Sequence, residues 1–350
     1  MTDVIGRAIV SVEALVMANG IDEFHGDLDR RHLIPLWRVA GQLLPGQPKP
    51  CAIPYLWRWK ELHALAMRAA ELVPVDRAAE RRVLALANPG LPGASAATPT
   101  LWGAVQILMP GELAPAHRHS PAALRFILQG EGAYTTVEGE KCVMRRGDLV
   151  LTPPWRWHDH GNEGRAPVIW FDGLDIPLVA MLDASFFEPF EEWTQKSAPG
   201  RSDRWSYPWA EIYPALAALA ERDSSPFEDL ALQYVTASGG PVLPTLACWV
   251  QRLRPEVRTR AHRHVSSAVY VAFEGTGFSV INGERFSWSP GDMFAVPPWA
   301  WHEHANPSST EDAILFSIHD TPVLQALGLQ REEAYDAHGG HQPVVREFAG

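Results

Sequence analysis

The stretch AHRHSPAALRFILQGEG at residues 116–132 returns with the same histidine spacing as AHRHVSSAVYVAFEGTG at residues 261–277. A second matching pair follows, with GDLVLTPPWRWHDHGN at residues 147–162 and GDMFAVPPWAWHEHAN at residues 291–306. The first pair is offset by 145 residues and the second by 144. The chain therefore contains one unit twice, and a one-residue change in a turn accounts for the difference in offset.

Each unit has the sequence pattern of β structure. Short alternating or apolar stretches are separated by Gly, Pro and Asn turns, for example at 123–128, 133–137, 148–152 and 167–171. Short strands at regular spacing are typical of sandwiches and barrels. Two copies are too few for a solenoid. The sequence therefore predicts an all-β core made of two similar barrels.

Helical segments are predicted outside the two units. ELHALAMRAAEL at 61–72 has apolar residues at helical spacing, and residues 209–221 have a helical pattern despite Pro214. We predict five parts, which are an N-terminal arm with a helix (1–100), a first β unit (101–180), a linker with a helix (181–240), a second β unit (241–325) and a C-terminal tail (326–350).

The composition argues against several classes of partner. The net charge of −11 provides no electrostatic reason to bind nucleic acid or an anionic membrane. Cys51, Cys142 and Cys248 form no CxxC pair, which favours a reduced compartment. The start of the chain lacks the pattern of a signal peptide, and no apolar run approaches the roughly 18–20 residues that span a bilayer. We therefore expect a cytoplasmic protein without nucleic-acid or membrane partners.

The histidines of the first unit have the spacing of metal ligands. In a strand, residues two apart share a face at roughly 6.5–7 Å, so His117 and His119 can point at one ion. His158 is the best third candidate, because in each copy this histidine follows a Gly-Asp turn and two prolines. Three neutral imidazoles suit Fe, Zn, Ni or Cu and leave coordination positions open. A lone His-x-His pair is often a surface feature, but its recurrence with the downstream histidine favours a metal site.

These stretches resemble the two sequence motifs of cupins. GELAPAHRHSPAALRFILQG at 111–130 is similar to the first motif, and residues 147–162 are similar to the second. Trp155 stands where the second motif usually has Gly, and Ala123 stands where the first has a glutamate ligand. With these departures, the two-unit layout and WFDGLDIP at 170–177, the chain resembles bicupin ring-cleaving dioxygenases. The nearest resemblance is to gentisate 1,2-dioxygenases and their salicylate and 1-hydroxy-2-naphthoate relatives.

The resemblance implies two double-stranded β-helix (jelly-roll) barrels, a homotetramer and one Fe(II) per subunit in the first unit. Without the glutamate, three neutral histidines leave the iron site at about +2, which suits an aromatic acid bound through carboxylate and phenolate, with room for dioxygen. The implied reaction cleaves gentisate (2,5-dihydroxybenzoate) between the carboxyl- and hydroxyl-bearing carbons to maleylpyruvate. Salicylate, substituted salicylates and 1-hydroxy-2-naphthoate are alternative substrates.

The resemblance also assigns a role to Arg125. Position 123 faces inward in the cupin motif, so Arg125, two residues later, should do the same. A buried guanidinium requires an anion, which we predict to be the substrate carboxylate. A structural salt bridge is the alternative, and Asp172 is a candidate partner in either case. His160 should share the face of His158 and is predicted to hydrogen-bond substrate or oxygen and to transfer protons, unless it is a rim histidine.

Three residues alternate onto one strand face ahead of the metal motif, namely Trp102, Ala104 and Gln106. The resemblance places them beside the substrate, where Trp102 could pack against the ring. Core packing would explain Trp102 and Ala104 equally well, and the recurrence of Gln106 as Gln251 favours a structural role. Arg81 and Arg82 are candidates for reaching the carboxylate from the arm, or form a solvated pair.

The second unit keeps three histidines at ligand spacing, namely His262, His264 and His302. A second metal ion is therefore an open alternative. The surroundings differ, since Tyr270 takes the place of Arg125 and Phe316 aligns with Asp172 at an offset of 144. We therefore predict catalysis in the first unit, with the second unit structural or carrying a metal without equivalent turnover.

Two other classes of function remain. One is a cupin isomerase or hydrolase that uses Zn or Mn, against which the missing glutamate and Arg125 weigh. The other is a non-catalytic bicupin, either a storage protein or a small-molecule sensor. Two intact histidine triads argue against storage, and the sequence shows no DNA-binding module for a regulator.

Overall fold

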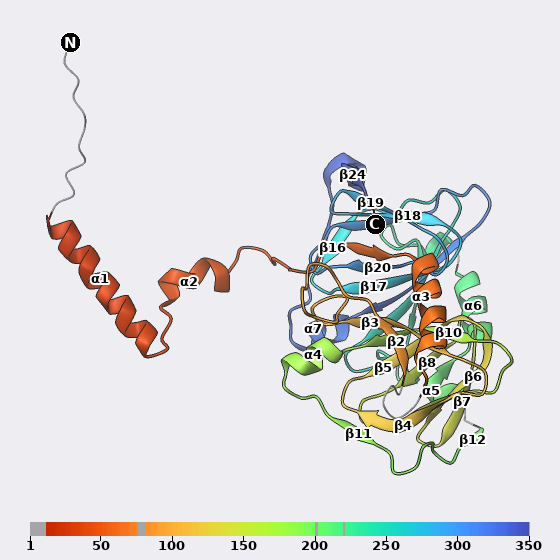
Figure 1. The fold of residues 1–350 in the computed structure, drawn as a ribbon. Coiled ribbons are helices and arrows are strands. Elements are labelled where there is room, and N and C mark those ends of the chain that lie inside the picture. Colours follow the sequence, from red (N-terminus) through yellow and green to blue (C-terminus); the bar gives the residue numbers. More distant parts are fainter. Residues whose placement is uncertain (1–11, 76–80, 200–201, 220, 350) are drawn as a thin grey trace. The chain divides into compact units, whose positions relative to one another are not determined.

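The computed structural model describes residues 12–75, 81–199, 202–219 and 221–349 (Figure 1). The chain divides into two compact units, residues 1–49 and residues 50–350. In its described part, the first unit contains α1 (Val12–Arg30) and α2 (Leu36–Leu43). The second unit contains both predicted barrels, and the site lies there.

The first barrel consists of two six-stranded sheets, in the orders β13-β8-β5-β10-β3-β2 and β11-β4-β9-β6-β7-β12. Its strands are β2 (Arg82–Ala85), β3 (Trp102–Leu108), β4 (Leu113–His119), β5 (Ala123–Gln129), β6 (Glu131–Val137), β7 (Glu140–Arg145), β8 (Leu149–Thr152), β9 (His158–Asn162), β10 (Val168–Leu174), β11 (Phe187–Pro189), β12 (Ala198–Pro199) and β13 (Ser206–Tyr207). Buried apolar residues from both sheets, including Ile127, Met144 and Trp170, fill its interior.

The second barrel repeats this arrangement strand for strand, in the orders β1-β20-β17-β22-β15-β14 and β23-β16-β21-β18-β19-β24. Its strands are β1 (Tyr55–Trp57), β14 (Leu230–Tyr234), β15 (Ala247–Leu253), β16 (His262–His264), β17 (Ala268–Glu274), β18 (Gly277–Ile281), β19 (Glu284–Trp288), β20 (Met293–Val296), β21 (His302–Ala305), β22 (Ala313–His319), β23 (Glu332–Ala334) and β24 (Arg346–Glu347). The predicted two-barrel, all-β core is confirmed.

Each barrel takes one edge strand from the other half of the chain. β1 precedes the first barrel but pairs with β20 of the second, whereas β13 precedes the second barrel but pairs with β8 of the first. An equivalent hydrogen bond follows each of these two strands. After β1, the Trp59 backbone N–H donates to Asp292 at 2.7 Å, and after β13, the Trp209 backbone N–H donates to Asp148 at 2.8 Å. The repeat therefore begins near residue 55, inside the predicted arm.

Short helices connect the strands. The helix predicted at 61–72 is present as α3 (Trp59–Leu72), and the helix predicted at 209–221 is present as α6 (Trp209–Ala217), which ends four residues earlier than predicted. The others in the two-barrel unit are α4 (Ile176–Met181), α5 (Ser202–Trp205), α7 (Thr321–Ala326) and the 3-10 turns η1 (Glu221–Asp223) and η2 (Ala337–Gly340). Residues 50–100, predicted as part of an arm, supply β1, α3 and β2 to this unit.

The two barrels pack through the outer faces of their central strands. The ring of Phe126 on β5 stacks on that of Phe316 on β22, with centroids 4.0 Å apart and planes 1° from parallel.

The strand register corrects one predicted correspondence between the repeats. It pairs Asp172 with Arg125 in the first barrel and Ser317 with Tyr270 in the second. The alignment of Phe316 with Asp172 is therefore wrong by one residue, and Ser317 is the counterpart of Asp172. A one-residue slip along a strand moves a side chain to the opposite face of the sheet.

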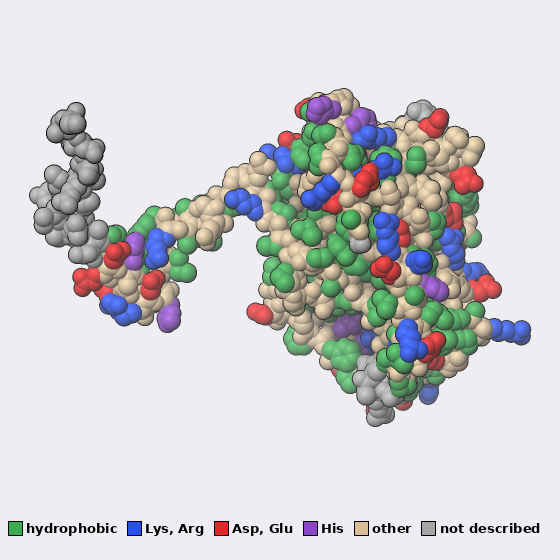
Figure 2. All heavy atoms as spheres, turned by 45° about the horizontal axis from the view of Figure 1, so that its top comes forward, with side chains coloured by type: hydrophobic (Ala, Val, Ile, Leu, Met, Phe, Trp, Pro, Cys, Tyr) green, Lys and Arg blue, Asp and Glu red, His purple; other side chains and the backbone are tan. Residues whose placement is uncertain are grey.

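The surface and the cysteines agree with the composition. Figure 2 shows acidic and basic side chains interspersed over the face that it presents of the two-barrel unit, without a continuous basic patch. The three cysteines are free. Among the described residues, no helix combines the length and apolar character needed to cross a membrane.

Candidate metal centre and active site

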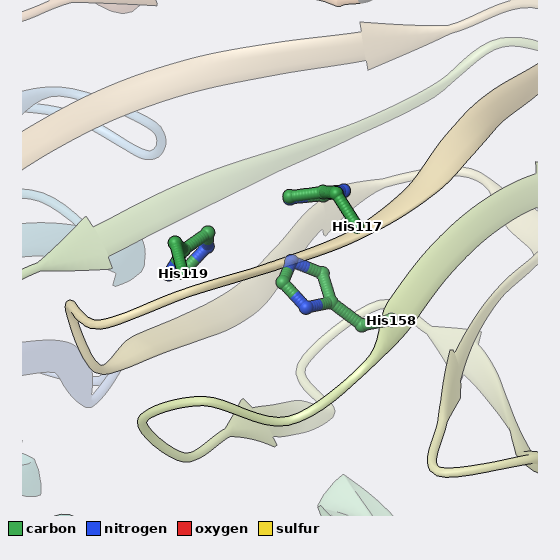
Figure 3. A group of neighbouring side chains, drawn as sticks. All are labelled: His117, His119 and His158. Carbon is green, nitrogen blue, oxygen red and sulfur yellow. The ribbon is translucent and has the colours of Figure 1, made fainter. Parts of the chain in front are cut away.

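Three histidines from two neighbouring strands meet in the first barrel (Figure 3). His117 and His119 share one face of β4, and His158 begins the adjacent strand β9, directly opposite His117. The candidate ligand nitrogens of the three rings lie within 4.8 Å of one another. The ring centroids of His117 and His158 are 4.0 Å apart, and those of His119 and His158 are 4.8 Å apart. The predicted triad is therefore assembled in the fold.

Hydrogen bonds orient the three rings for metal binding. Nδ1 of each ring lies 2.8–3.0 Å from a backbone carbonyl oxygen two residues away in the chain. An Nδ1–H donated to a carbonyl fixes the tautomer and leaves the Nε2 lone pair available to a metal, although at His117 Nη2 of Arg81 lies 2.9 Å from Nε2. Nε2 of His158 is buried and makes no hydrogen bond. Because a buried polar atom without a partner is costly, this nitrogen fits a metal ligand.

The surroundings keep these rings neutral. Burial is the main cause that lowers the pKa of His117 and of His158 well below the usual value, and it lowers the pKa of His119 to about 4. Arg81 and Arg125 lower the pKa of His117 and of His119 further by charge repulsion. Since a histidine must be neutral to bind a metal ion, the triad is ready for metal near neutral pH.

A cavity of about 380 Å³ opens beside the triad. Its wall includes the three histidines together with Arg81, Val83, Trp102, Gln106, Pro121, Arg125, Asp172, Leu174, Ile176, Ser185, Phe186 and Phe187. Apolar and aromatic side chains thus surround a small number of converging cationic and polar groups. A site of this kind suits a small planar anion with an aromatic ring.

Arg125 is a buried cation at the inner end of this cavity. Its Nη1 donates to Thr152 Oγ1 at 2.7 Å, and its Nε lies 3.5 Å from Asp172 Oδ1. Nε itself makes no hydrogen bond. Burial raises the pKa of Asp172 to about 6, against the opposing effect of Arg125, and Asp172 also accepts a hydrogen bond from Trp170 at 3.0 Å. Arg125 therefore keeps hydrogen-bonding capacity for a further anion.

The two neighbouring arginines point in different directions at the start of β2, which begins at Arg82. Arg81 lines the cavity, with Nη2 2.9 Å from His117 Nε2. Arg82 points to the other side, where it pairs with Glu112 and donates to the Ala70 carbonyl at 2.9 Å. The structure thus brings Arg81, and not Arg82, into the site.

The remaining predicted residues lie at different depths. Trp102 and Gln106 line the cavity, and Gln106 Nε2 is buried without a hydrogen-bond partner. Ala104, between them on the same strand face, is fully buried and is not among the lining residues. His160 also lies behind the wall, with Nδ1 2.9 Å from Thr135 Oγ1 and Nε2 unpartnered.

Known proteins share this sequence and architecture. The Cupin domain family matches residues 104–176 and 249–319. The chain is 42% identical to 5-aminosalicylate 1,2-dioxygenase of Comamonas sp over 94% of each chain. It is 41% identical to gentisate 1,2-dioxygenase of Streptomyces sp over 89% of this chain and 94% of the relative. The chain belongs to the gentisate and salicylate 1,2-dioxygenase family. The crystal structure of salicylate 1,2-dioxygenase from Pseudoaminobacter salicylatoxidans, with gentisate adducts, matches at a TM-score of 0.84, with 36% identity over 94% of this chain and 95% of that chain.

Membership confirms the bicupin fold and the class of ring-cleaving dioxygenase. Several residues that line the cavity of this dioxygenase were not predicted from the sequence. Phe187 on β11 stacks on His117, with centroids 5.2 Å apart and planes at 22°. Phe186 lines the cavity beside it, although both side chains are largely exposed. The available signal was the pair of adjacent phenylalanines shortly after residue 180.

Contacts of the Trp155 side chain account for the departure from the second cupin motif, in which this position is usually Gly. Trp155 has a φ of 62°, a left-handed conformation that usually requires Gly, and Trp299 repeats it at 61°. The Arg118 guanidinium lies 4.5 Å from the centroid of Trp155 and 4.4 Å from that of Trp157. Such cation–π contacts offset the cost of the backbone conformation and hold together the strand ends that carry the ligands.

We expect the metal-free dioxygenase to lose stability on acidification. Burial lowers the pKa of His304 and of His319 to about 3, and the triad histidines shift in the same direction. Unfolded histidines take up protons near pH 6.5 while these stay neutral in the fold, so falling pH favours unfolding. Between pH 6.5 and 5, each such histidine removes about 2 kcal/mol.

Urea unfolding of chelator-treated protein between pH 7.5 and 5 measures this effect. His319→Gln should show a shallower pH dependence than the wild type, because one of the shifted groups is gone. A free energy of unfolding that stays constant or rises on acidification would contradict the expectation.

Proposed function

We propose that this dioxygenase cleaves the ring of gentisate or of a salicylate substituted at the same position, between the carboxyl- and hydroxyl-bearing carbons. The relatives named above act on 5-aminosalicylate, gentisate and salicylate, which share a carboxylate beside a hydroxyl group. One observation carries the proposal, which is a buried arginine facing a histidine triad across a largely apolar cavity. With gentisate, the product would be maleylpyruvate.

His117, His119 and His158 would hold one Fe(II) in the first barrel. Three neutral nitrogens without a carboxylate leave coordination positions for small ligands. Bound there, iron would supply the redox chemistry that allows dioxygen to react with an aromatic ring. Both oxygen atoms enter the product and none leaves as water, so the reaction needs no external reductant. The ring supplies the electrons.

The protein's own part is to bind and orient the ring. Arg125 would hold the substrate carboxylate through charge-assisted hydrogen bonds, with Arg81 as a second cationic partner at the cavity wall. Trp102, Leu174 and Phe187 would contact the faces and edges of the ring and exclude water. Fixing the carboxylate in this way places the adjacent hydroxyl beside the triad.

His160 is proposed to accept a hydrogen bond rather than to bind metal. Its Nδ1 is engaged with Thr135, and its Nε2 is buried and free of hydrogen bonds. Burial is the main cause that lowers its pKa well below the usual value, so the ring is neutral and its Nε2 lone pair can accept a hydrogen bond. We propose that it accepts a hydrogen bond from the substrate hydroxyl or from a small ligand bound at the triad.

Oxygen uptake after anaerobic loading with Fe(II) tests the proposed reaction. The panel should contain gentisate, 5-aminosalicylate, salicylate and 1-hydroxy-2-naphthoate, with benzoate as the control that lacks the hydroxyl. We expect one O2 consumed per ring with gentisate or 5-aminosalicylate, and none with benzoate. Absence of uptake with every ortho-hydroxy acid would overturn the proposal and favour a non-oxygenase bicupin.

Phe187→Ala should weaken substrate binding more than turnover. The side chain stacks on His117 at the cavity wall, where it can contact the ring of the substrate. Losing about 1 kcal/mol of aromatic contact corresponds to a rise in KM of about fivefold. Steady-state oxygen uptake measures this, with Phe190→Ala as the control, because Phe190 packs on Trp157 and is not among the cavity residues. An unchanged KM in Phe187→Ala would contradict the assigned contact.

We also propose the homotetramer and the cytoplasmic location that the family resemblance implies. The three free cysteines support a reducing compartment. Light scattering after size-exclusion chromatography tests the assembly, with a mass of four chains as the expected result.

A further inference from the structure

The second barrel contains a cavity of about 250 Å³ whose chemistry is unlike that of the first. Its lining includes Glu228 and Glu332, and no Lys or Arg is present among the described lining residues. The strand registers show which residues of the two cavities correspond. Tyr270 stands in the place of Arg125, and Glu332, which pairs with His264, stands in the place of Phe187, which pairs with His119. The second cavity is therefore acidic where the first is cationic or aromatic.

The second triad has the same three histidines as the first, but Nδ1 of His262 is buried without a hydrogen-bond partner, whereas Nδ1 of His117 has one. The candidate ligand nitrogens of His262, His264 and His302 lie within 4.8 Å of one another, and all three side chains are buried. Nδ1 of His264 and of His302 lie 2.7 and 3.0 Å from backbone carbonyl oxygens. Nε2 of His302 is buried and has no hydrogen-bond partner, as in His158 of the first barrel. These features orient imidazole lone pairs toward one point.

A carboxylate stands next to this point. Glu228 Oε1 lies 3.5 Å from His262 Nε2. This separation exceeds that of a normal N–H···O hydrogen bond. Two ligand atoms that share one ion at about 2.1 Å are about 3.0–3.4 Å apart, which is close to the observed separation.

The first barrel has the opposite charge at the equivalent place. There the Arg81 guanidinium lies 2.9 Å from Nε2 of His117, the counterpart of His262. A cation beside the first triad attracts an anionic substrate, whereas a carboxyl group beside the second triad offers an oxygen ligand to a metal ion. The two triads are thus built for different occupants.

We propose that the second barrel binds its own divalent transition-metal ion through His262, His264, His302 and Glu228, and that it excludes aromatic carboxylates. Three imidazoles and one carboxylate form a mixed N/O ligand set that suits first-row metals. The carboxylate lowers the charge of the site and occupies a coordination position that the first triad leaves open. Glu332 in the place of Phe187 puts a carboxyl group where an aromatic ring lines the first cavity, which disfavours an anionic ring. This inference is independent of the proposed ring cleavage, because it is tested by metal binding alone.

Metal content of the full chain provides the test. Chelator-treated protein is loaded anaerobically with Fe(II), desalted and measured by elemental analysis, and the same samples are titrated with Co(II) followed by its visible absorption. We expect two ions per chain in the wild type and one in either His119→Ala or His264→Ala. Glu228→Gln should retain the first ion and bind the second at least tenfold more weakly in chelator competition, with a changed Co(II) spectrum.

Glu332→Gln is the matched control, because it removes a carboxylate from the same cavity without removing a proposed ligand. Its second-site affinity should stay within about threefold of the wild type, so that a loss in Glu228→Gln reports ligation rather than charge. One ion per chain in both the wild type and His264→Ala would overturn the second site. Equal affinity and unchanged Co(II) spectra in Glu228→Gln and the wild type would overturn the role of Glu228.

Discussion

Arg125→Met lowers kcat/KM for gentisate by about 100- to 4,000-fold and leaves the first-site metal in place. Arg125 is buried, lines the cavity and donates one hydrogen bond to Thr152, while its Nε makes no hydrogen bond and lies 3.5 Å from Asp172 Oδ1. Removing one member of a buried ion pair costs about 3–5 kcal/mol, and each 1.4 kcal/mol is tenfold. Because methionine has similar length and no charge, it removes the carboxylate partner without opening a large void. Oxygen uptake and metal analysis of the same sample separate the two effects.

The double variant Arg125→Met/Asp172→Asn distinguishes substrate binding from fold stability. Asp172 Oδ1 lies 3.5 Å from Arg125 Nε, so the single variant leaves a buried carboxylate without its cation. The double variant removes both charges and should recover the melting temperature, while activity stays low. If the double variant recovers a wild-type KM together with its stability, Arg125 serves only a structural ion pair.

His158→Ala abolishes iron retention at the first site and reduces oxygen uptake below detection. The imidazole is buried, and its Nε2 has no other partner in the fold. Loss of an outer hydrogen bond to a ligand already costs about 10- to 100-fold in metal affinity, so loss of a ligand costs more. Elemental analysis after anaerobic loading and desalting measures the retained metal.

His302→Ala is the matched control, because His302 occupies the same strand position in the second barrel. It creates a cavity of equal size in an equivalent fold and should retain first-site iron and most of the oxygen uptake. Equal loss of activity in the two variants would mean that both triads take part in the reaction.

The internal repeat explains why much of the fold was predictable. Conserved spacing of His117, His119 and His158 with their counterparts predicted two barrels, two triads and the strand that carries each ligand. Strand alternation then placed Arg125 and Gln106 on the cavity side. These inferences depend on local geometry, which a sequence pattern encodes directly.

The exchange of edge strands between the barrels could not be predicted in the same way. β1 and β13 are short, and each pairs with a strand far away in the chain. No local pattern specifies which barrel such a strand joins. The wrong alignment of Phe316 with Asp172 has a related cause. The offset between the two repeats is 144 around the third histidine but returns to 145 in β22, and the sequence pattern does not show where it changes back.

The sequence did not single out every cavity residue that lies at the end of a strand or on a connecting segment. Arg81 and Arg82 are chemically identical neighbours. Which of them faces the cavity depends on where β2 begins, and the sequence does not specify that position. Phe186 and Phe187 lie beyond the predicted end of the first unit and become cavity residues through the pairing of β11 with β4. Aromatic residues on a connecting segment acquire their role from tertiary contacts.

Oxygen uptake with gentisate by His119→Ala and His264→Ala tests most directly whether ring cleavage occurs at the first triad. After anaerobic Fe(II) loading, His264→Ala should consume O2 at a rate near that of the wild type and incorporate both atoms of labelled O2 into the product. His119→Ala should consume none. Full uptake by His119→Ala, or loss of uptake by His264→Ala alone, would contradict the placement of the reaction in the first barrel.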